Sequence, residues 1–275
     1  MKRIRNLFLP FLVFAFVVAC GGNANSGATQ ASPVTAHPQN DSEVFALYLQ
    51  AVEELLTPGS MTIRYVMDVV FEYTDSGYYA SMVITSMISQ IIRDASDFDM
   101  QFTLYTEILD EPHGDPLTTY YRNGRIYTPR ADMPEGGFSM ERNITEAVTT
   151  AGYNIFTDMI GSLFVNEELV TLPGGTELRF NLIEDTVITS LFQTMTETWF
   201  NLSLYDDTSF GDISVYVFLD NDNLLQYAEI YVPLHITLED EPLYISSIFI
   251  MEVLQRGNVT IDFPHYLDDF YVVTE

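Results

Sequence analysis

The sequence predicts an α+β fold in which one curved antiparallel β-sheet wraps amphipathic helices. Three observations lead to this prediction. Long segments alternate between apolar and polar residues, as strands with one buried face do. Other segments repeat apolar residues at helical spacing, and short turn sequences separate neighbouring strand segments, as in antiparallel meanders. Because an apolar sheet face needs a cover and an amphipathic helix needs a sheet, one domain that packs the two together satisfies both.

The opening residues read as an export signal that ends at the only cysteine of the chain. Three basic residues stand among the first five, and the apolar run 7–19 that follows is too short to cross a bilayer as a helix. Residues 17–20 (VVAC) resemble the bacterial lipobox, in which the cysteine carries a diacylglycerol and the signal is cut in front of it. A buried free thiol or an intermolecular disulfide is the alternative, but the position of Cys20 directly after the apolar run favours an anchor. We expect a lipoprotein signal peptide at 1–19 and acyl chains such as palmitate on Cys20, which would hold the protein on the extracytoplasmic face of the cell membrane.

Residues 20–42 are expected to form a flexible tether, because they are small and polar with a single charge at Asp41. Residues 43–275 are long enough to build one domain around one large core. The whole chain has a net charge of −28 and only one lysine, in the signal. Such a charge repels the phosphates of nucleic acids and anionic lipid head groups, so we expect no nucleic acid partner. The sequence identifies no protein partner.

The first half of the domain is predicted to be a helix followed by a meander of long strands. Asn40 and Glu43 fit a capping box, and the apolar residues after them keep helical spacing as far as the stop signal at 57–59. In the next segment the odd-numbered residues are apolar and the even-numbered ones mostly polar. Asn123 and Gly124 suit a type I′ hairpin turn. The strands are predicted at 61–74, 78–93 and 97–109, with the hairpin at 119–127.

The second half is predicted to contain helices and then a second meander. Asn143 and Glu146 fit another capping box, Gly152 interrupts the apolar stripe behind them, and residues 185–200 form the most regular amphipathic helix of the chain. Pro233 falls inside a strand segment, where it predicts a bulge or an edge. The strands of this half are predicted at 176–183, 213–219, 225–238, 243–255 and 258–263.

In the order and length of these elements the chain resembles the LolA/LppX-like bacterial lipoproteins, especially their uncharacterised Gram-positive branch. The resemblance covers residues 42–273 and rests on the segments SMTIRYVMDVVFEY, YYRNGRIYT, VFLDNDNLLQYAEIYV and VTIDFPHYLDDF rather than on a signature motif. It implies a half-barrel sheet whose concave face, lidded by helices, holds acyl chains or lipoglycolipids. It transfers no individual ligand residue to this chain.

The apolar faces of the predicted strands and of helix 185–200 are the candidate lining of an apolar ligand site. Methionine and aromatic side chains suit a promiscuous apolar pocket, but they pack equally well as a filled core, and the sequence leaves both interpretations open. The candidate lining residues are Met61, Ile63, Tyr65, Met67, Val69, Phe71, Phe98, Met100, Phe102, Ile188, Phe192, Met195 and Trp199.

No catalytic, nucleotide-binding or metal-binding motif is present in the sequence, so we expect no enzymatic activity, no cofactor and no metal. His113, His235 and His265 stand far apart in the chain, where isolated histidines are most often structural. The acidic turn at 220–223 lacks the glycine and the distal glutamate of an EF-hand loop. Three hypotheses follow: a lipid-anchored carrier of an apolar ligand, a surface interaction protein with a filled core, and, ranked last, an enzyme.

Overall fold

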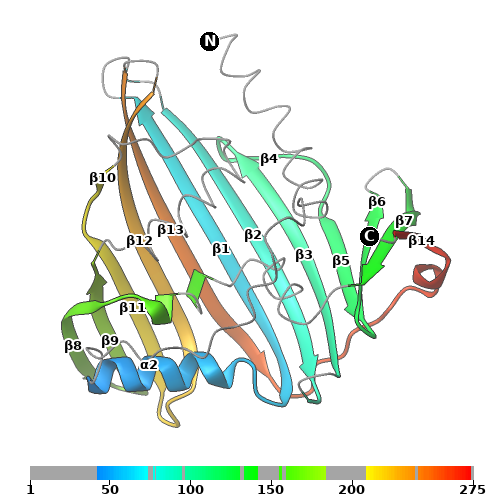
Figure 1. Ribbon diagram of the computed structural model, residues 1–275, viewed down its shortest axis with the longest axis horizontal. Helices are drawn as coiled ribbons and strands as arrows, with labels where there is room; N and C mark the ends of the chain where they lie inside the picture. Colours follow the sequence, from blue (N-terminus) through cyan, green and yellow to red (C-terminus); the bar gives the residue numbers. More distant parts are fainter. Residues whose placement is uncertain are drawn as a thin grey trace.

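One curved, open antiparallel sheet is the framework of the protein, as the sequence predicts (Figure 1). The computed structural model describes residues 42–73, 77, 79–94, 97–130, 133–141, 155–156, 159–183, 209–238 and 241–273. Cys20, the tether as far as Asp41 and the predicted helix 185–200 with its four candidate lining residues lie outside these ranges. The same holds for the predicted middle helices except at residues 155–156 and 159–163.

The chain forms two meanders that meet at the centre of the sheet. The first meander consists of β1 (Gly59–Tyr73), β2 (Tyr79–Ile92), β3 (Phe98–Ile108), β5 (Leu117–Arg122), β6 (Arg125–Arg130) and β7 (Met133–Glu141). The second consists of β8 (Phe164–Leu172), β9 (Gly175–Leu182), β11 (Ile213–Asp220), β12 (Leu225–Leu238) and β13 (Glu241–Arg256). The short elements are α2 (Glu43–Glu54), β4 (Glu111–Pro112), η1 (Met159–Gly161), β10 (Ser209–Phe210), η2 (His265–Asp269) and β14 (Tyr271–Val273).

Strand β1 and strand β13 join the two meanders, although they stand at opposite ends of the domain sequence. They pair antiparallel from Met61 opposite Arg256 to Tyr73 opposite Leu243. The resulting order is β14-β7-β6-β5-β3-β2-β1-β13-β12-β11-β9-β8, with β4 beside β3 and β10 beside β12. The pairing of β14 with β7 is parallel, and the other described pairings are antiparallel.

The alternation along β1 divides the sheet into an apolar concave face and a mixed convex face. The odd-numbered side chains from Met61 to Phe71 are buried, and Tyr73 is partly buried against the same core. On the other face, Arg64 is exposed and forms an ion pair of 2.5 Å with Glu252 on β13. Because directly opposed residues in an antiparallel pair share a face, this division extends from β1 to its neighbours on both sides.

The start of the first helix differs from the prediction. Ser42, not Asn40, is the N-cap of α2, and its Oγ accepts a hydrogen bond of 3.0 Å from the backbone N–H of Phe45. Serine caps helices as well as asparagine does, and Ser42 stands immediately before the first helical residue. The spacing between Asn40 and Glu43 matched a capping box, but a better placed cap was two residues further along the chain.

Other differences concern one predicted strand that has no pairing partner and two strands that the sequence did not predict. The predicted strand 258–263 is wrong: this segment has alternating residues but no ladder, because β13 before it is already flanked by β1 and β12. Strands β7 and β8 were missed. The first is rich in glycine (MPEGGFSME), and in the second a register shift between Val165 and Glu168 breaks the alternation.

Turn and proline signals were more informative. Asn123 and Gly124 adopt φ angles of 54° and 75° between β5 and β6, as a type I′ turn requires. Pro233 lies within β12 opposite Ser246 of β13, so β12 is not an edge strand. On its other side the neighbouring strand is interrupted between β10 and β11, where the Gly211 N–H donates to the Pro233 carbonyl at 2.9 Å. The irregularity that the proline predicts is therefore found in the partner strand.

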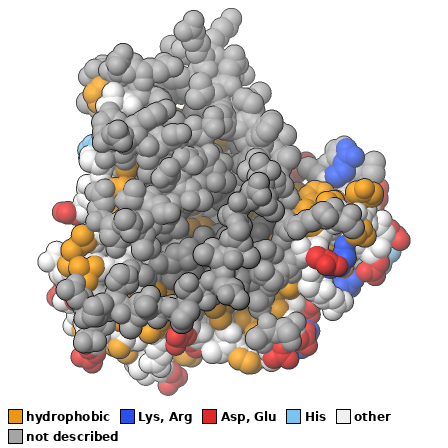
Figure 2. Space-filling view, viewed as in Figure 1, with side chains coloured by type: hydrophobic (Ala, Val, Ile, Leu, Met, Phe, Trp, Pro, Cys, Tyr) orange, Lys and Arg blue, Asp and Glu red, His pale blue; other side chains and the backbone are white. Residues whose placement is uncertain are grey.

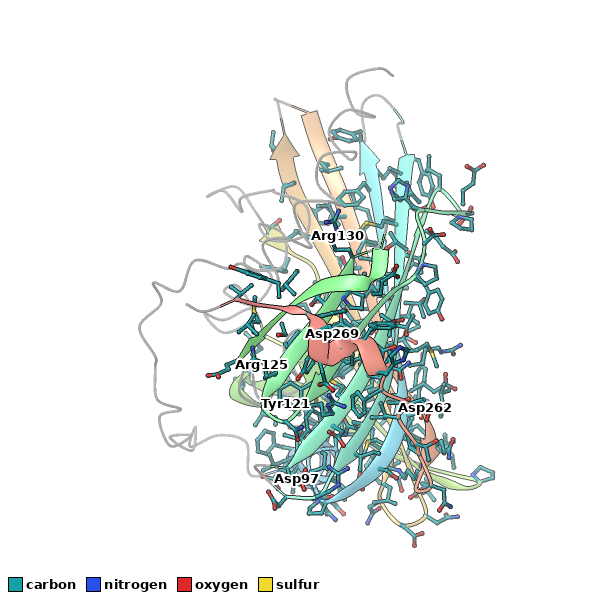
Figure 3. The ribbon with its side chains drawn as sticks, turned by 90° about the vertical axis from the view of Figure 1, so that its right-hand side faces the viewer. Asp97, Tyr121, Arg125, Arg130, Asp262 and Asp269 are labelled. Atoms are coloured by element: carbon teal, nitrogen blue, oxygen red, sulfur yellow. The ribbon has the colours of Figure 1, made fainter. Side chains whose placement is uncertain are left out.

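The C-terminal segment covers the convex face of the first meander. Leu267 and Phe270 are buried against Tyr120 of β5 and Tyr127 of β6, and Arg122 reaches Asp268 at 2.5 Å. Figure 3 shows the turn η2 in front of these strands. The described residues thus form two separate apolar clusters, of which the larger lies on the concave face.

Candidate apolar ligand site on the concave face

The concave face brings together the described members of the predicted lining set. Each of them is at most 6 % exposed and belongs to the larger core cluster. They are Met61, Ile63, Tyr65, Met67, Val69 and Phe71 of β1 and Phe98, Met100 and Phe102 of β3. That a ligand touches them stays a proposal, because burial alone is the same in a lined pocket and in a filled core.

Strand register adds residues to this face that sequence reasoning did not single out. Met67 stands opposite Ile84 of β2 on one side and Phe249 of β13 on the other, and all three are buried. Ile230 of β12 in turn stands opposite Phe249. The signal was present in the alternation of these strands, but only the pairing of β1 with β13 shows that the two meanders share one face.

Helix α2 closes one end of the concave face by packing against β8, β9 and β12 (Figure 1). The Tyr48 ring meets the rings of Phe164 and Phe180 edge-on, each at 5.5 Å, and these two rings stack on each other at 4.0 Å. Burial raises the pKa of Tyr48, so its hydroxyl stays protonated. This hydroxyl donates to the carbonyl oxygen of Phe156 at 2.5 Å and so ties α2 to the segment that begins at residue 155.

The same segment reaches the middle of the face. Ile155, Phe156 and Met159 are at most 1 % exposed. The Phe156 ring meets the Tyr65 ring of β1 edge-on, with 6.2 Å between ring centroids and an interplanar angle of 89°. Sequence reasoning placed this stretch in a helical stripe but did not assign Phe156 to the site. The contact joins residues 91 positions apart in the chain, and no local pattern reveals it.

Few polar side chains interrupt the concave face. Gln90 of β2 donates from Nε2 to the Leu55 carbonyl at 2.9 Å and so caps the end of α2. Ser86, also on β2, is 1 % exposed, and its Oγ has no hydrogen-bond partner among the described residues. Tyr65 stands directly opposite Ser86. Its hydroxyl forms no hydrogen bond with any described residue, and burial raises its pKa.

The three histidines are not assembled into a site. His113 is exposed in the turn after β4, His235 is exposed on β12 with its ring 4.8 Å from that of Tyr244, and His265 is exposed in η2. Across the described ranges, no group of three or more His, Cys, Asp or Glu side chains is placed to hold a metal ion. Nor does any described helix have the length and apolar character needed to cross a membrane.

The acidic turn between β11 and β12 uses its first carboxylate to hold the chain. Asp220 Oδ1 accepts from the N–H groups of Asp222 and Leu224 at 2.9 and 3.0 Å, and Oδ2 accepts from Gln226 at 2.9 Å. Asn223 takes a positive φ of 60° in this turn. These bonds are those of an Asx-type turn, in which the Asp220 carboxylate fixes the hairpin backbone.

Comparison with known proteins gives similarities of fold only. No protein-family model matches the sequence, and no curated protein matches it. Among solved structures, LprF from Mycobacterium bovis is similar, with a TM-score of 0.36 and 12 % identity over 81 % of this chain and 97 % of that one. The structure of lipid–protein interactions in lipovitellin has a TM-score of 0.36 and 9 % identity over 76 % of this chain and 26 % of that one. A putative outer membrane lipoprotein-sorting protein domain from Vibrio parahaemolyticus has a TM-score of 0.23 and 8 % identity over 82 % and 96 %.

Proposed function

We propose that the protein binds or carries an apolar ligand, a lipid or an acyl chain, on the concave face of its sheet. A lipid on Cys20 would hold it on the extracytoplasmic face of the cell membrane, with residues 20–42 as the tether. In this proposal the protein is not an enzyme. The ligand site is made of the buried side chains of β1, β2, β3, β12 and β13, with α2 at one end.

The observation that supports the proposal is the extent of the continuous apolar face. The face runs from β9 through β1 to β6, and α2 packs mainly against β8, β9 and β12 at one end of it. Methionine and aromatic side chains adapt to chains of different length and shape, and Met67, Met251 and Phe249 lie side by side at its centre. Such a surface suits a ligand that is long and apolar.

A second candidate function is supported by the contact of Phe156 with Tyr65. Phe156 is fully buried and lies against the middle of the concave face. If neighbouring segments continue this contact over the whole face, the core is filled, and the protein is a surface interaction lipoprotein that binds a partner through its convex face or loops.

One substitution distinguishes the two candidates. Met67 is 2 % exposed at the centre of the concave face, so Met67→Trp adds volume there. In a carrier it narrows the site, so lipid binding weakens while the thermal melt stays close to that of the native protein. In a filled core it overpacks the interior and lowers the free energy of unfolding by about 1–3 kcal/mol, with no binding to lose. The measurement is a lipid titration and a thermal melt of both proteins.

The anchor is tested separately. Cys20→Ala should release the protein from membranes or leave an unprocessed precursor, and incorporation of labelled palmitate should cease. Processed protein that still fractionates with membranes and lacks the cysteine would contradict the anchor.

A further inference from the structure

We infer that the convex face of β1, β2 and β13 is a docking surface for a basic protein, which places a lysine or arginine side chain on Asp68 and aliphatic side chains around it. This surface lies on the opposite side of the sheet from the proposed ligand site and does not depend on the proposed function. It is carried by an unpaired carboxylate in the middle of a partly exposed aliphatic patch.

The aliphatic side chains around Asp68 are unusual for the outer face of a sheet. The solvent-facing side of an antiparallel sheet is normally polar. Here five partly exposed aliphatic residues share the face with Asp68: two are its neighbours on β1, and three stand on the strands that pair with β1. An exposed apolar area with a polar border is typical of an interaction site. This convex patch consists of Val66 and Val70 of β1, Val83 of β2, and Ile248 and Ile250 of β13.

Asp68 lies at the centre of the convex patch without a partner. Among the described residues, none forms a hydrogen bond or an ion pair with its carboxylate. Arg64, the one cation on β1, pairs with Glu252 instead. Desolvation raises the pKa of Asp68 above its ordinary value, and the charge of Asp110, in the turn after β3, raises it further. A carboxylate in such surroundings is unfavourable for the free protein, and a cation from a partner would compensate it.

The border of the convex patch is acidic and aromatic. Glu72 of β1 and Glu107 of β3 are exposed, and Glu107 stands opposite Val83 of the patch. Tyr105 of β3 is 42 % exposed, and Tyr231 of β12 stands opposite Ile248. Tyrosine is enriched in protein interfaces, and its ring also attracts cations. The border therefore fits a partner surface in which lysine or arginine side chains stand among aliphatic ones.

A basic protein suits this surface better than a second copy of the chain or a membrane. The chain has a net charge of −28, and acidic side chains also line the lower rim of the described surface on the side of α2 (Figure 2). In a symmetric contact each copy would bring its own unpaired Asp68 and no cation to meet the other. Anionic lipid head groups would be repelled as well. A basic partner is attracted over a long range and covers the aliphatic side chains on binding.

The test uses synthetic peptides of equal length as probes of this chemistry. The protein is the full chain with Cys20→Ala, and binding is measured by the fluorescence anisotropy of labelled peptides. The first peptide alternates valine with lysine, the second valine with glutamate, and the third serine with lysine. We expect the valine–lysine peptide to bind about tenfold more tightly than either of the others, because it alone combines apolar contact with a cation for the carboxylate.

Two matched variants connect this binding to Asp68. Asp68→Asn should weaken binding of the valine–lysine peptide about tenfold, since a hydrogen bond to a charged group is lost. Asp222→Asn removes the same charge from an exposed turn outside the convex patch and should change binding by less than about twofold. Met67→Trp alters the concave face and should leave peptide binding unchanged, which separates this surface from the proposed ligand site.

The unpaired carboxylate also predicts a gain in stability when it is removed. Asp68→Val continues the valines at positions 66 and 70 and should raise the melting temperature at pH 7 by about 2–4 °C. A side chain kept for the fold itself would give the opposite shift. A variant that melts later and binds the valine–lysine peptide more weakly is the expected signature of a residue kept for a partner.

Each contrary result overturns the inference. Equal weakening by Asp68→Asn and Asp222→Asn would show that the peptide is attracted by the acidic surface as a whole. Equal binding of all three peptides, or of none, would show that the convex patch does not select a basic and apolar partner. A lower melting temperature for Asp68→Val would show that the carboxylate stabilises the protein itself. These outcomes leave lipid binding on the concave face untouched.

Discussion

Replacing Met67 with aspartate tests whether the concave face is a buried apolar surface at the register described. Met67 is 2 % exposed and lies between Ile84 and Phe249. Loss of a buried methionine side chain typically costs about 2–5 kcal/mol. At pH 7 the new carboxyl must in addition be protonated or buried with its charge, and holding it neutral three pH units above its ordinary pKa costs about 4 kcal/mol. The sum is comparable with the whole stability of an ordinary domain.

The pH dependence gives this prediction its sign. Burial without a partner raises the pKa of the new carboxyl in the folded state above its value in the unfolded state. The added penalty is therefore absent below the unfolded pKa of about 4 and grows by about 1.4 kcal/mol for each pH unit above it. Relative to the native protein, Met67→Asp should lose about 2.7 kcal/mol more at pH 7 than at pH 5, measured by urea unfolding at both pH values.

The control for this substitution lies on the same strand. Thr62 is half-buried on the convex face, two residues from Arg64. Thr62→Asp should change the free energy of unfolding by no more than about 1 kcal/mol and should show little dependence on pH in this range. Equal losses for Met67→Asp and Thr62→Asp, or a Met67→Asp loss that does not grow with pH, would refute the assignment of the two faces.

Two further predictions concern backbone packing and the convex face. Gly175→Ala should lower the free energy of unfolding by about 1–3 kcal/mol, because an added Cβ would lie 1.9 Å from the Leu219 carbonyl oxygen. Gly59→Ala is the control, because its added Cβ would lie 4.0 Å from the nearest atom. In the same thermal melt it should be neutral or slightly stabilising. The hydrogen bond with Tyr231 raises the pKa of Tyr244 to about 12, so Tyr231→Phe should move that pKa back toward its ordinary value in an ultraviolet titration. Because a raised pKa stabilises the protein at lower pH and this contribution is lost as pH rises through about 12, the variant should also lose less stability in alkali.

Local patterns in the sequence predicted the parts of the fold that depend on local chemistry. The unbroken alternation of residues 61–73 was sufficient to define the buried face of β1, since a slip of one residue would expose all of it. Asn123 and Gly124 predicted their turn, because few residues adopt positive φ at two successive positions.

Features that depend on contacts between residues distant in the chain could not be predicted from the sequence. The pairing of β1 with β13 brings together residues 170 to 195 positions apart, and no local signal specifies it. Phe156 was not predicted as part of the concave face because only its ring contact with Tyr65 places it there. Ser86 was not predicted because only the register of β2 against β1 places it opposite Tyr65. Residues 258–263 are the opposite case: their alternation is typical of a strand, but they pair with no neighbouring strand and form none.

Native mass spectrometry of the protein purified from its own cells tests the central claim most directly. If the concave face carries an apolar ligand, the spectrum should contain a complex heavier than the processed, acylated chain by the mass of one lipid. That lipid should be released by organic extraction and should be absent or reduced for Met67→Trp. A spectrum with only the unliganded chain, together with a native protein that binds none of the lipid probes in solution, would contradict the carrier function and leave a surface interaction protein with a filled core.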